Sequence, residues 1–533
     1  MSRLDWLSEY LARLIDEHVV VRSGDAQGLA PAHRLVLDSE DWGAAARVAA
    51  AFGCRWAGVW GDVEAGDSEG TQLTLRAALE RDGGFVVLET EVPVTFPVLA
   101  SHTNHFPAAD RMERHLRDLL GVGFHDHPDA RRWVRHQAWQ ENEFPLRHYV
   151  AASGHPPLRT RADSDYPFLR IQGNGVYEIP VGPVHAGIIE PGHFRFQAMG
   201  EEVLRLEERL GYTHKGIEKI AVGRDPAALA RLAARVSGDS TVAHAWAACQ
   251  AMERATHCQV PPRALFLRAL MAERERVANH LGDIGAICND VGFAFAHMQC
   301  GRLRELWQRS SHALFGHRFM MDALIPGGVA RDLPADAPAR LRAEHAALRR
   351  EIAPVFAVVD DHPSLDDRLI GTGCLSAADA RLLGCTGYVG KASGQAFDLR
   401  HDSPYAPYDR LHVDVPVQQE GDVAARVRVR MEEVRISLLL MDRLLDLLPS
   451  GPIAATLPQP AGGTTGLGLV EGWRGEILAF VRFGADGRIA RYFPRDPSWF
   501  TWPALERLIH GNIVPDFPVC NKSVNGSYSG HDL

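Results

Sequence analysis

Between residues 225 and 325 the chain has long stretches rich in Ala, Leu, Arg and Glu with helical periodicity. Apolar residues that recur at three- and four-residue intervals mark helices that must bury one face against other helices. The stretches break near Pro261–Pro262 and at the IPGG sequence of 325–328, so they predict several long helices. Further helices are predicted over 335–361, 376–384 and 422–448. The middle of this chain is therefore a helical bundle.

The two ends of the chain have a different texture. Residues 1–150 combine a helical start, two β-rich runs bounded by glycine and a charged helix, which predicts an α+β domain. Residues 151–167 are polar and rich in Pro, Ser and Gly, and are predicted to be a linker. From 168 to 533 we expect one mainly α-helical domain with small flanking sheets: a hairpin near its start, and short strands over 465–533. The predicted fold class is α+β.

Composition excludes several classes of function. The formal net charge of −10 argues against binding to nucleic acid, which requires a basic face. The acidic start of the chain is unlike a signal peptide, and no run of 18 apolar residues is present, so membrane association is expected only through partner subunits. The eight cysteines form no CxxC pair, which predicts buried thiols in a reducing compartment and no iron–sulfur cluster on this chain.

Several separated segments together carry a family resemblance. They are GPVHAGIIEPGHFRF (182–196), YTHKGIEK (212–219), RVSGDSTVAH (235–244), GKASGQAFDLRHDSPYAPYD (390–409) and NGSYSGHDL (525–533). In this order they resemble the large subunit of energy-converting, membrane-bound NiFe hydrogenases and the homologous 49-kDa subunit of respiratory complex I. Residues 105–133 and FPLRHYV (144–150) resemble the 30-kDa subunit of complex I. The large subunit of formate hydrogenlyase is a similar fusion.

The resemblance implies a metal site whose ligands are missing here. In those hydrogenases an early and a late pair of cysteines hold nickel and iron, because these metals require soft anionic sulfur. The early pair corresponds to Ser237 and Ser240, and the late pair to Ser527 and Gly530. An alternative alignment of the end, with Cys520 and Ser523 as the late pair, still leaves three thiolates missing. We therefore expect no NiFe centre and no metal.

The quinone site of the complex I relatives is also incomplete. The resemblance places a quinone-binding histidine at His185, but Ile189 stands at the second histidine position and Gly238 at the tyrosine position. His193 or Tyr212 are alternative partners for a quinone, although nothing in the sequence requires them.

A polar frame remains around these positions. Glu218 corresponds to a proton-relay residue of the hydrogenases, and His244 is a candidate proton carrier because imidazole titrates near neutrality. With Asp239, these two residues form a hypothetical proton-handling cluster; exposed or core structural roles are the alternatives. Further residues are interpreted as the frame of the pocket. Two of them, Asp398 and Arg400, are predicted to form an ion pair, for which a structural role is favoured. The frame comprises His185, His193, Lys391, Asp398, Arg400 and Asp532.

Two other motifs have weaker meanings. GGTTGLG (462–468) lacks the Lys-Ser/Thr of a phosphate loop, so nucleotide binding there is not expected. The H-x-H of His125 and His127 is a formal metal pair, but the resemblance favours a structural role.

These observations predict a peripheral subunit on the cytoplasmic side of the cell membrane, in a complex-I-like, hydrogenase-related assembly. The expected partners are a small, 20-kDa-like iron–sulfur subunit that carries one or more 4Fe–4S clusters, and antiporter-like and other membrane subunits. The role would be to dock the iron–sulfur subunit and to couple electron transfer to ion translocation. The alternatives are a working oxidoreductase that reduces a quinone or another acceptor in the vacated cavity, and a scaffold without redox chemistry.

Overall fold

A five-stranded sheet organises the N-terminal part of the chain in this computed structural model, which describes residues 5–25, 28–63, 72–136, 139–153 and 166–533. The strand order is β1-β2-β5-β4-β3, with β2 and β5 parallel and the other neighbours antiparallel. The strands are β1 (Val21–Asp25), β2 (His33–Leu37), β3 (Arg55–Val63), β4 (Gln72–Arg81), β5 (Gly84–Pro93), and the separate pair β6 (Val98–Ala100) and β7 (Gly123–His125). The helices are α1 (Asp5–Asp16), η1 (Ser39–Asp41), α2 (Trp42–Ala51), η2 (Pro107–Ala109) and α3 (Asp110–Leu120).

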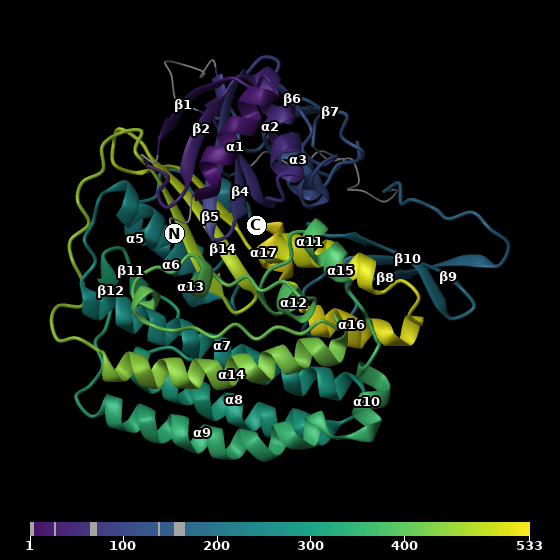
Figure 1. Ribbon diagram of the computed structural model, residues 1–533, viewed down its shortest axis with the longest axis vertical. Coiled ribbons are helices and arrows are strands. Elements are labelled where there is room, and N and C mark those ends of the chain that lie inside the picture. Colours follow the sequence, from purple (N-terminus) through teal and green to yellow (C-terminus); the bar gives the residue numbers. More distant parts are fainter. Residues whose placement is uncertain (1–4, 26–27, 64–71, 137–138, 154–165) are drawn as a thin grey trace.

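Long helices make up the core of the second part, as the sequence predicts. Figure 1 shows α7, α8, α9 and α14 lying side by side below the N-terminal sheet. The helices are α4 (Ile217–Ala221), α5 (Pro226–Ala233), α6 (Thr241–Ala255), α7 (Pro262–Asp290), α8 (Ala294–Phe315), α9 (Ala337–Asp360), α10 (Pro363–Leu369), α11 (Ala377–Leu382), α12 (Gly387–Ala392), α13 (Leu399–Asp402), η3 (Tyr408–Arg410), α14 (Val423–Asp446), α15 (Ser498–Leu508), η4 (Val514–Asp516), α16 (Phe517–Val524) and α17 (Tyr528–Asp532).

Small sheets flank this bundle. An antiparallel sheet with the order β10-β9-β8 extends away from the body in Figure 1, and a meander, β13-β14-β15, packs on α6. The strands are β8 (Val176–Val181), β9 (His193–Met199), β10 (Glu202–Arg209), β11 (Leu324–Ile325), β12 (Gly328–Val329), β13 (Thr465–Gly472), β14 (Gly475–Phe483) and β15 (Ile489–Arg495). The α+β fold class is thus confirmed. Twelve residues of the predicted linker, 154–165, lie outside the described part of the chain.

Close backbone contact explains the glycines of β13. A Cβ atom on Gly466 would lie 2.0 Å from the carbonyl oxygen of Ala251, and one on Gly468 would lie 1.9 Å from that of Ala247. Only glycine permits this approach of a strand to an alanine-rich helix. The GGTTGLG motif therefore contributes to helix–sheet packing.

The two parts of the chain meet through buried charged side chains of β3, β14 and β15. Arg482 donates to Asp62 at 2.8 Å, and Arg55 forms an ion pair with Glu476 at 2.5 Å. Trp60 stacks on Phe493 beside these pairs, with ring centroids 5.6 Å apart. Because charged groups are buried only when paired, these contacts fix how the domains sit on each other.

The prediction of strands over 465–533 is correct up to β15 and wrong beyond it. Residues 498–508, 517–524 and 528–532 are helical. Trp499, Trp502 and Leu505 follow one another at three-residue spacing, and all three are buried. This is the period of a helix face, which the bulky aromatic residues obscured.

Candidate functional site

The structure brings the early and late ligand positions together. Ser237 lies in the turn before α6, and Ser527 caps the N-terminus of α17 by accepting a hydrogen bond from the backbone N–H of Gly530 at 2.9 Å. The two serine hydroxyl oxygens are 2.8 Å apart, and the side chains are 2% and 6% exposed. The correspondence drawn from the resemblance therefore describes one site in space.

Hydrogen bonds fill the space between these positions. The Ser237 hydroxyl donates to Oδ1 of Asp239 at 2.8 Å, so in the 2.8 Å contact between the serines the donor is Ser527. Two oxygens at this distance leave no room for a ligand between them. Neutral hydroxyl groups are also hard ligands that do not replace thiolates around nickel. The residues present do not fit a NiFe centre.

Gly530, the fourth position, is closed by a neighbouring carboxyl group. A Cβ atom on Gly530 would lie 2.7 Å from Cγ and 2.8 Å from Oδ2 of Asp496. Asp496 in turn lies 2.8 Å from Nε2 of His244, and both side chains are buried. Burial opposes ionisation of Asp496, but the hydrogen bond and charge of His244 outweigh it and lower the pKa of Asp496. His244 is thus one half of a buried pair.

Asp239 is held by a cation that the sequence did not reveal. Arg474 donates to both oxygens of its carboxylate, at 2.7 and 2.6 Å, and also to the Ser240 hydroxyl at 3.2 Å. Burial raises the pKa of Asp239, but the charge of Arg474 more than compensates, so the pKa is lowered. The carboxylate is therefore ionised and fixed in orientation beside the serine pair.

Glu218 lies between the two parts of the chain. Its carboxylate is 2.7 Å from Nε2 of His115, on α3, and it forms an ion pair with Arg491, on β15. Burial raises the pKa of Glu218, but Arg491 and His115 together lower it to about 2.

No hydrogen bond or ion pair joins Glu218, Asp239 and His244 to one another within the described residues. Each is paired with a different partner, at least 103 positions away in sequence: His115, Arg474 or Asp496. The three residues thus frame the site without forming a directly bonded cluster.

Lys391, Asp398 and Arg400 belong to one buried network. Nζ of Lys391 lies 2.6 Å from Asp398 and 2.7 Å from Glu433, on α14. Arg400 donates to Asp398 at 2.7 Å and to Glu273, on α7, at 2.9 Å. Acid and base alternate in this network, which joins α7, α12, α13 and α14. Such pairing is what permits charge in a core, so the geometry supports a structural role for these residues.

The remaining frame residues hold the hairpin and the C-terminal tail. Nε2 of His185 is 3.4 Å from the hydroxyl oxygen of Tyr528, and Nδ1 of His193 is 3.3 Å from the carbonyl oxygen of Gly182. Burial lowers the pKa of His193. Asp532 accepts hydrogen bonds from the backbone N–H groups of Gly211 and Thr213, at 2.9 and 3.0 Å. These contacts fasten α17 to the chain segment that leads into α4.

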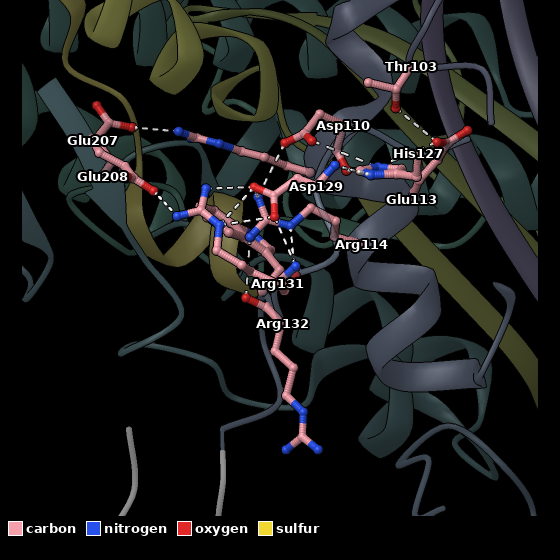
Figure 2. Close-up of polar contacts among 12 residues, drawn as sticks. Thr103, Asp110, Glu113, Arg114, His127, Asp129, Arg131, Arg132, Glu207 and Glu208 are labelled. Atoms are coloured by element: carbon pink, nitrogen blue, oxygen red, sulfur yellow. Dashed lines mark hydrogen bonds and ion pairs between the residues drawn. The ribbon is translucent and has the colours of Figure 1, made fainter. Parts of the chain in front are cut away.

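His127, the second histidine of the H-x-H segment, makes structural contacts, and Figure 2 shows it beside Asp110 and Asp129. Both ring nitrogens of His127 are engaged: Nδ1 accepts from the backbone N–H of Asp129 at 3.0 Å, and Nε2 lies 3.3 Å from the carbonyl oxygen of Asp110. Arg131 links Asp129 to Glu207 of β10 and so connects the two domains. Within the residues that the structure describes, no group of three His, Cys, Asp or Glu side chains is arranged to hold a metal ion.

Three known protein families match successive segments of the chain, first in the N-terminal part and then in the helical part. Residues 35–156 match the 30 Kd subunit of respiratory-chain NADH dehydrogenase, residues 215–282 match nickel-dependent hydrogenase, and residues 290–462 match the 49 Kd subunit of respiratory-chain NADH dehydrogenase.

Individual relatives agree with these matches. Formate hydrogenlyase subunit 5 of Escherichia coli (strain K12) is 33% identical, over 84% of this chain and 79% of that protein. A carbon monoxide-induced hydrogenase of Rhodospirillum rubrum is 34% identical, over 66% and 97%. The fused C/D polypeptide of an NADH-quinone oxidoreductase from Bacteroides fragilis is 29% identical, over 79% and 82%.

A solved structure shares the fold. A chain of the membrane-bound sulfane sulfur reductase, an archaeal respiratory membrane complex, superposes with a TM-score of 0.63 at 28% identity, covering 67% of this chain and 99% of that one. In the described part of the present chain, no helix has the length and apolar character needed to cross a membrane.

Proposed function

We propose that this chain, which belongs to the family of complex I 30- and 49-kDa-like subunits and membrane-bound hydrogenase large subunits, serves in such a complex without a NiFe centre. It would be a peripheral subunit on the cytoplasmic face of the membrane. There it would dock a small iron–sulfur subunit, which carries the 4Fe–4S clusters, against antiporter-like membrane subunits and couple electron transfer to ion translocation. The relatives are named as a formate hydrogenlyase subunit, a carbon monoxide-induced hydrogenase and an NADH-quinone oxidoreductase subunit, which supports a place in such a complex.

One observation carries this proposal. The Ser237 and Ser527 hydroxyls are in hydrogen-bond contact at 2.8 Å, at positions where the resembling hydrogenases have cysteine sulfur atoms that bind nickel and iron. Asp496 occupies the space of a side chain at Gly530. Two independent features thus argue against a NiFe centre: the serine hydroxyls are unsuitable ligands, and Asp496 blocks the position of a side chain at Gly530.

The hairpin loop between β8 and β9 supports docking to an apolar partner. Ile188 is 99% exposed and Val184 is 80% exposed, while Ile189 is 47% exposed. Three large apolar side chains on one loop are unfavourable in water and favour burial against another surface. We expect Ile188→Lys to abolish co-purification with the membrane subunits while leaving the folded chain intact. Unchanged co-purification would remove this loop from the docking surface.

Metal analysis of the purified complex tests the main proposal. We expect iron from the partner's clusters and no nickel; one nickel per complex would refute the proposal. Replacing Ser237, Ser240, Ser527 and Gly530 together by cysteine is expected to give no nickel binding while Asp496 remains. The same variant with Asp496→Ala is the matched control, because it restores the space that a side chain at position 530 requires.

Reduction of an acceptor is a second candidate function, and one contact favours it. The phenol of Tyr528 lies 3.4 Å from Nε2 of His185, which places a tyrosine beside the hairpin histidine although position 238 is glycine. Such a pair is suited to donate hydrogen bonds to a quinone carbonyl. The test is a quinone-reductase assay of the complex with Tyr528→Phe. Loss of turnover with intact assembly would favour this alternative. Unchanged turnover would remove Tyr528 from any acceptor site, and absence of turnover in the wild-type complex would favour the scaffold.

A further inference from the structure

A small cavity lies beside the serine pair, between the turn before α6, helix α7, helix α8 and the segment that follows α8. Its volume is about 10 Å³, at the lower limit that one water molecule requires. Its lining includes Asp239, Glu275, Ala278, Asn279, Gln308 and Arg318. Oxygen and nitrogen atoms of several of these side chains are suited to hold a water.

The Asp239 side of the cavity connects to the buried hydroxyls. Ser527 donates to Ser237 at 2.8 Å, and Ser237 donates to the Asp239 carboxylate at 2.8 Å. A series of hydroxyls that ends on a carboxylate is a path along which protons can move by exchange of hydrogen bonds. This series leads from α17 to the cavity.

Glu275 stands on the α7 side as a buried carboxyl group without an ion pair in the described structure. Its oxygens accept from the backbone N–H groups of Val242 and Ala243, at 2.7 and 3.2 Å. The neighbouring cations are engaged elsewhere: Arg274 with Glu344 at 2.9 Å, and Arg276 with Glu433 at 3.0 Å.

The protonation of Glu275 follows from this environment. Burial, together with the negative charge of Asp239, raises the pKa of Glu275 to about 8, although the two backbone donors and Arg276 oppose the shift. Glu275 therefore carries a proton at neutral pH. The amide of Asn279 donates to the carbonyl oxygens of both Asp239 and Glu275, at 2.7 and 2.9 Å, and holds the two segments together.

The far end of the cavity lies at Arg318, in the segment that follows α8. Arg318 donates to the side-chain oxygen of Gln308 at 2.6 Å and to Glu305 at 2.6 Å. The Arg318 side chain is 48% exposed. Polar groups thus continue from the buried serines, past the cavity, to solvent.

We propose that Asp239, a water in this cavity and Glu275 form a proton-conducting link between the Ser237–Ser527 pair and the exposed end of the cavity at Arg318. Each hydroxyl, carboxyl or water oxygen releases one proton as it receives another, and no electron is transferred; Gln308 and Arg318 border the exit to solvent and carry no proton. The inference rests on the proposed function for its purpose, because proton movement beside the former metal site would accompany redox coupling. Glu218 is not part of this link, because its carboxylate contacts Arg491 and His115 and it does not line the cavity.

Infrared spectroscopy of the purified complex after mixing into D2O tests the link. The C=O band of a protonated carboxyl shifts when O–H becomes O–D, and Glu275→Gln identifies the band of Glu275. Glu471 is the matched control: it is equally buried, its pKa is also raised to about 8 by burial, and it lies away from the cavity. We expect Glu275 to exchange at least tenfold faster than Glu471, identified with Glu471→Gln.

A cavity-filling variant, Ala278→Val, provides the second measurement and keeps both carboxyl groups. We expect this variant to slow the hydrogen–deuterium exchange of Glu275 to the exchange rate of Glu471. Equal rates for the two bands in the wild type, or an unchanged Glu275 rate in Ala278→Val, would overturn the proposal. If Glu275→Gln does not fold, the loss of the fast component in Ala278→Val supports the link, and its persistence contradicts it. Nickel content decides the proposed function separately, because the exchange rates do not depend on it.

Discussion

The pairing of Glu218 gives a sharp prediction, because it distinguishes a structural carboxylate from a proton relay. Glu218 lies on α4 between His115 of the N-terminal domain and Arg491 of β15. The change Glu218→Gln keeps the shape of the side chain and removes its charge. Arg491 then remains buried without its partner. We expect the variant to lose stability rather than to lose only a step of proton transfer.

The pKa of Glu218 sets the magnitude. Its value of about 2 in the folded protein, against the ordinary 4.5, corresponds to about 3 kcal/mol at 1.36 kcal/mol per pKa unit. Because the folded pKa is the lower one, this stabilisation is fully present above pH 4.5 and is lost as the pH falls from 4.5 through about 2. The difference between wild type and Glu218→Gln should therefore be largest at neutral pH and vanish near pH 2.

Urea unfolding followed by tryptophan fluorescence measures this difference. The matched control is Glu432→Gln, which breaks the exposed ion pair with Arg435 and is expected to cost less than about 1 kcal/mol. If Glu218→Gln is as stable as Glu432→Gln at pH 7, the ion pair does not hold the domains together and the reasoning fails. A variant of unchanged stability with reduced turnover would restore Glu218 as a relay.

Three further predictions follow from buried groups. Lys391→Met removes the buried cation that Asp398 and Glu433 share and leaves this network one positive charge short. It is expected to cost about 3–5 kcal/mol in urea unfolding, whereas Arg428→Ala, which breaks an exposed ion pair, should cost under about 1 kcal/mol. Gly530→Ala should lower the thermal midpoint, because its Cβ would clash with Asp496. Adding Asp496→Ala removes this clash without restoring full stability, so a double-mutant cycle should show coupling between the two positions. Burial raises the pKa of Glu113 from 4.5 to about 7, so the folded protein holds an extra proton between these values and stability falls as the pH rises from 4.5 to 7; Glu113→Gln should flatten that slope.

The sequence was most informative where a periodic pattern extends over many residues. Helices predicted over 335–361 and 422–448 appear as α9 (Ala337–Asp360) and α14 (Val423–Asp446), because long amphipathic repeats leave few alternatives. The helices after residue 498 were missed, since an aromatic-rich run resembles a strand until its three-residue spacing is counted. Strand β4 (Gln72–Arg81) was missed as well, because residues 64–71 before it have no hydrophobic pattern that would indicate a neighbouring strand.

The site shows a different limit. Ser237 and Ser527 are in hydrogen-bond contact, at the two ends of the chain that the resemblance assigns to one metal site. The partners of the charged residues were not foreseen. Arg474 lies 235 positions from Asp239, and Asp496 lies 252 positions from His244. Ion pairs between such distant positions leave no periodic trace in one sequence, so only the fold reveals them.

These partners explain how the chain's own residues compensate the buried charges of the site. Hydroxyls at positions 237 and 527 are neutral and satisfy each other, so they introduce no charge that a cation must balance. The two carboxylates beside them, Asp239 and Asp496, are each matched to a base, Arg474 or His244. Without these bases the two buried acids would be uncompensated, at a cost of several kcal/mol each. The serine pair and the two acid–base pairs therefore form one arrangement, in which hydrogen bonds and ion pairs within the chain hold the start of α6, α17 and the segments around Arg474 and Asp496 together.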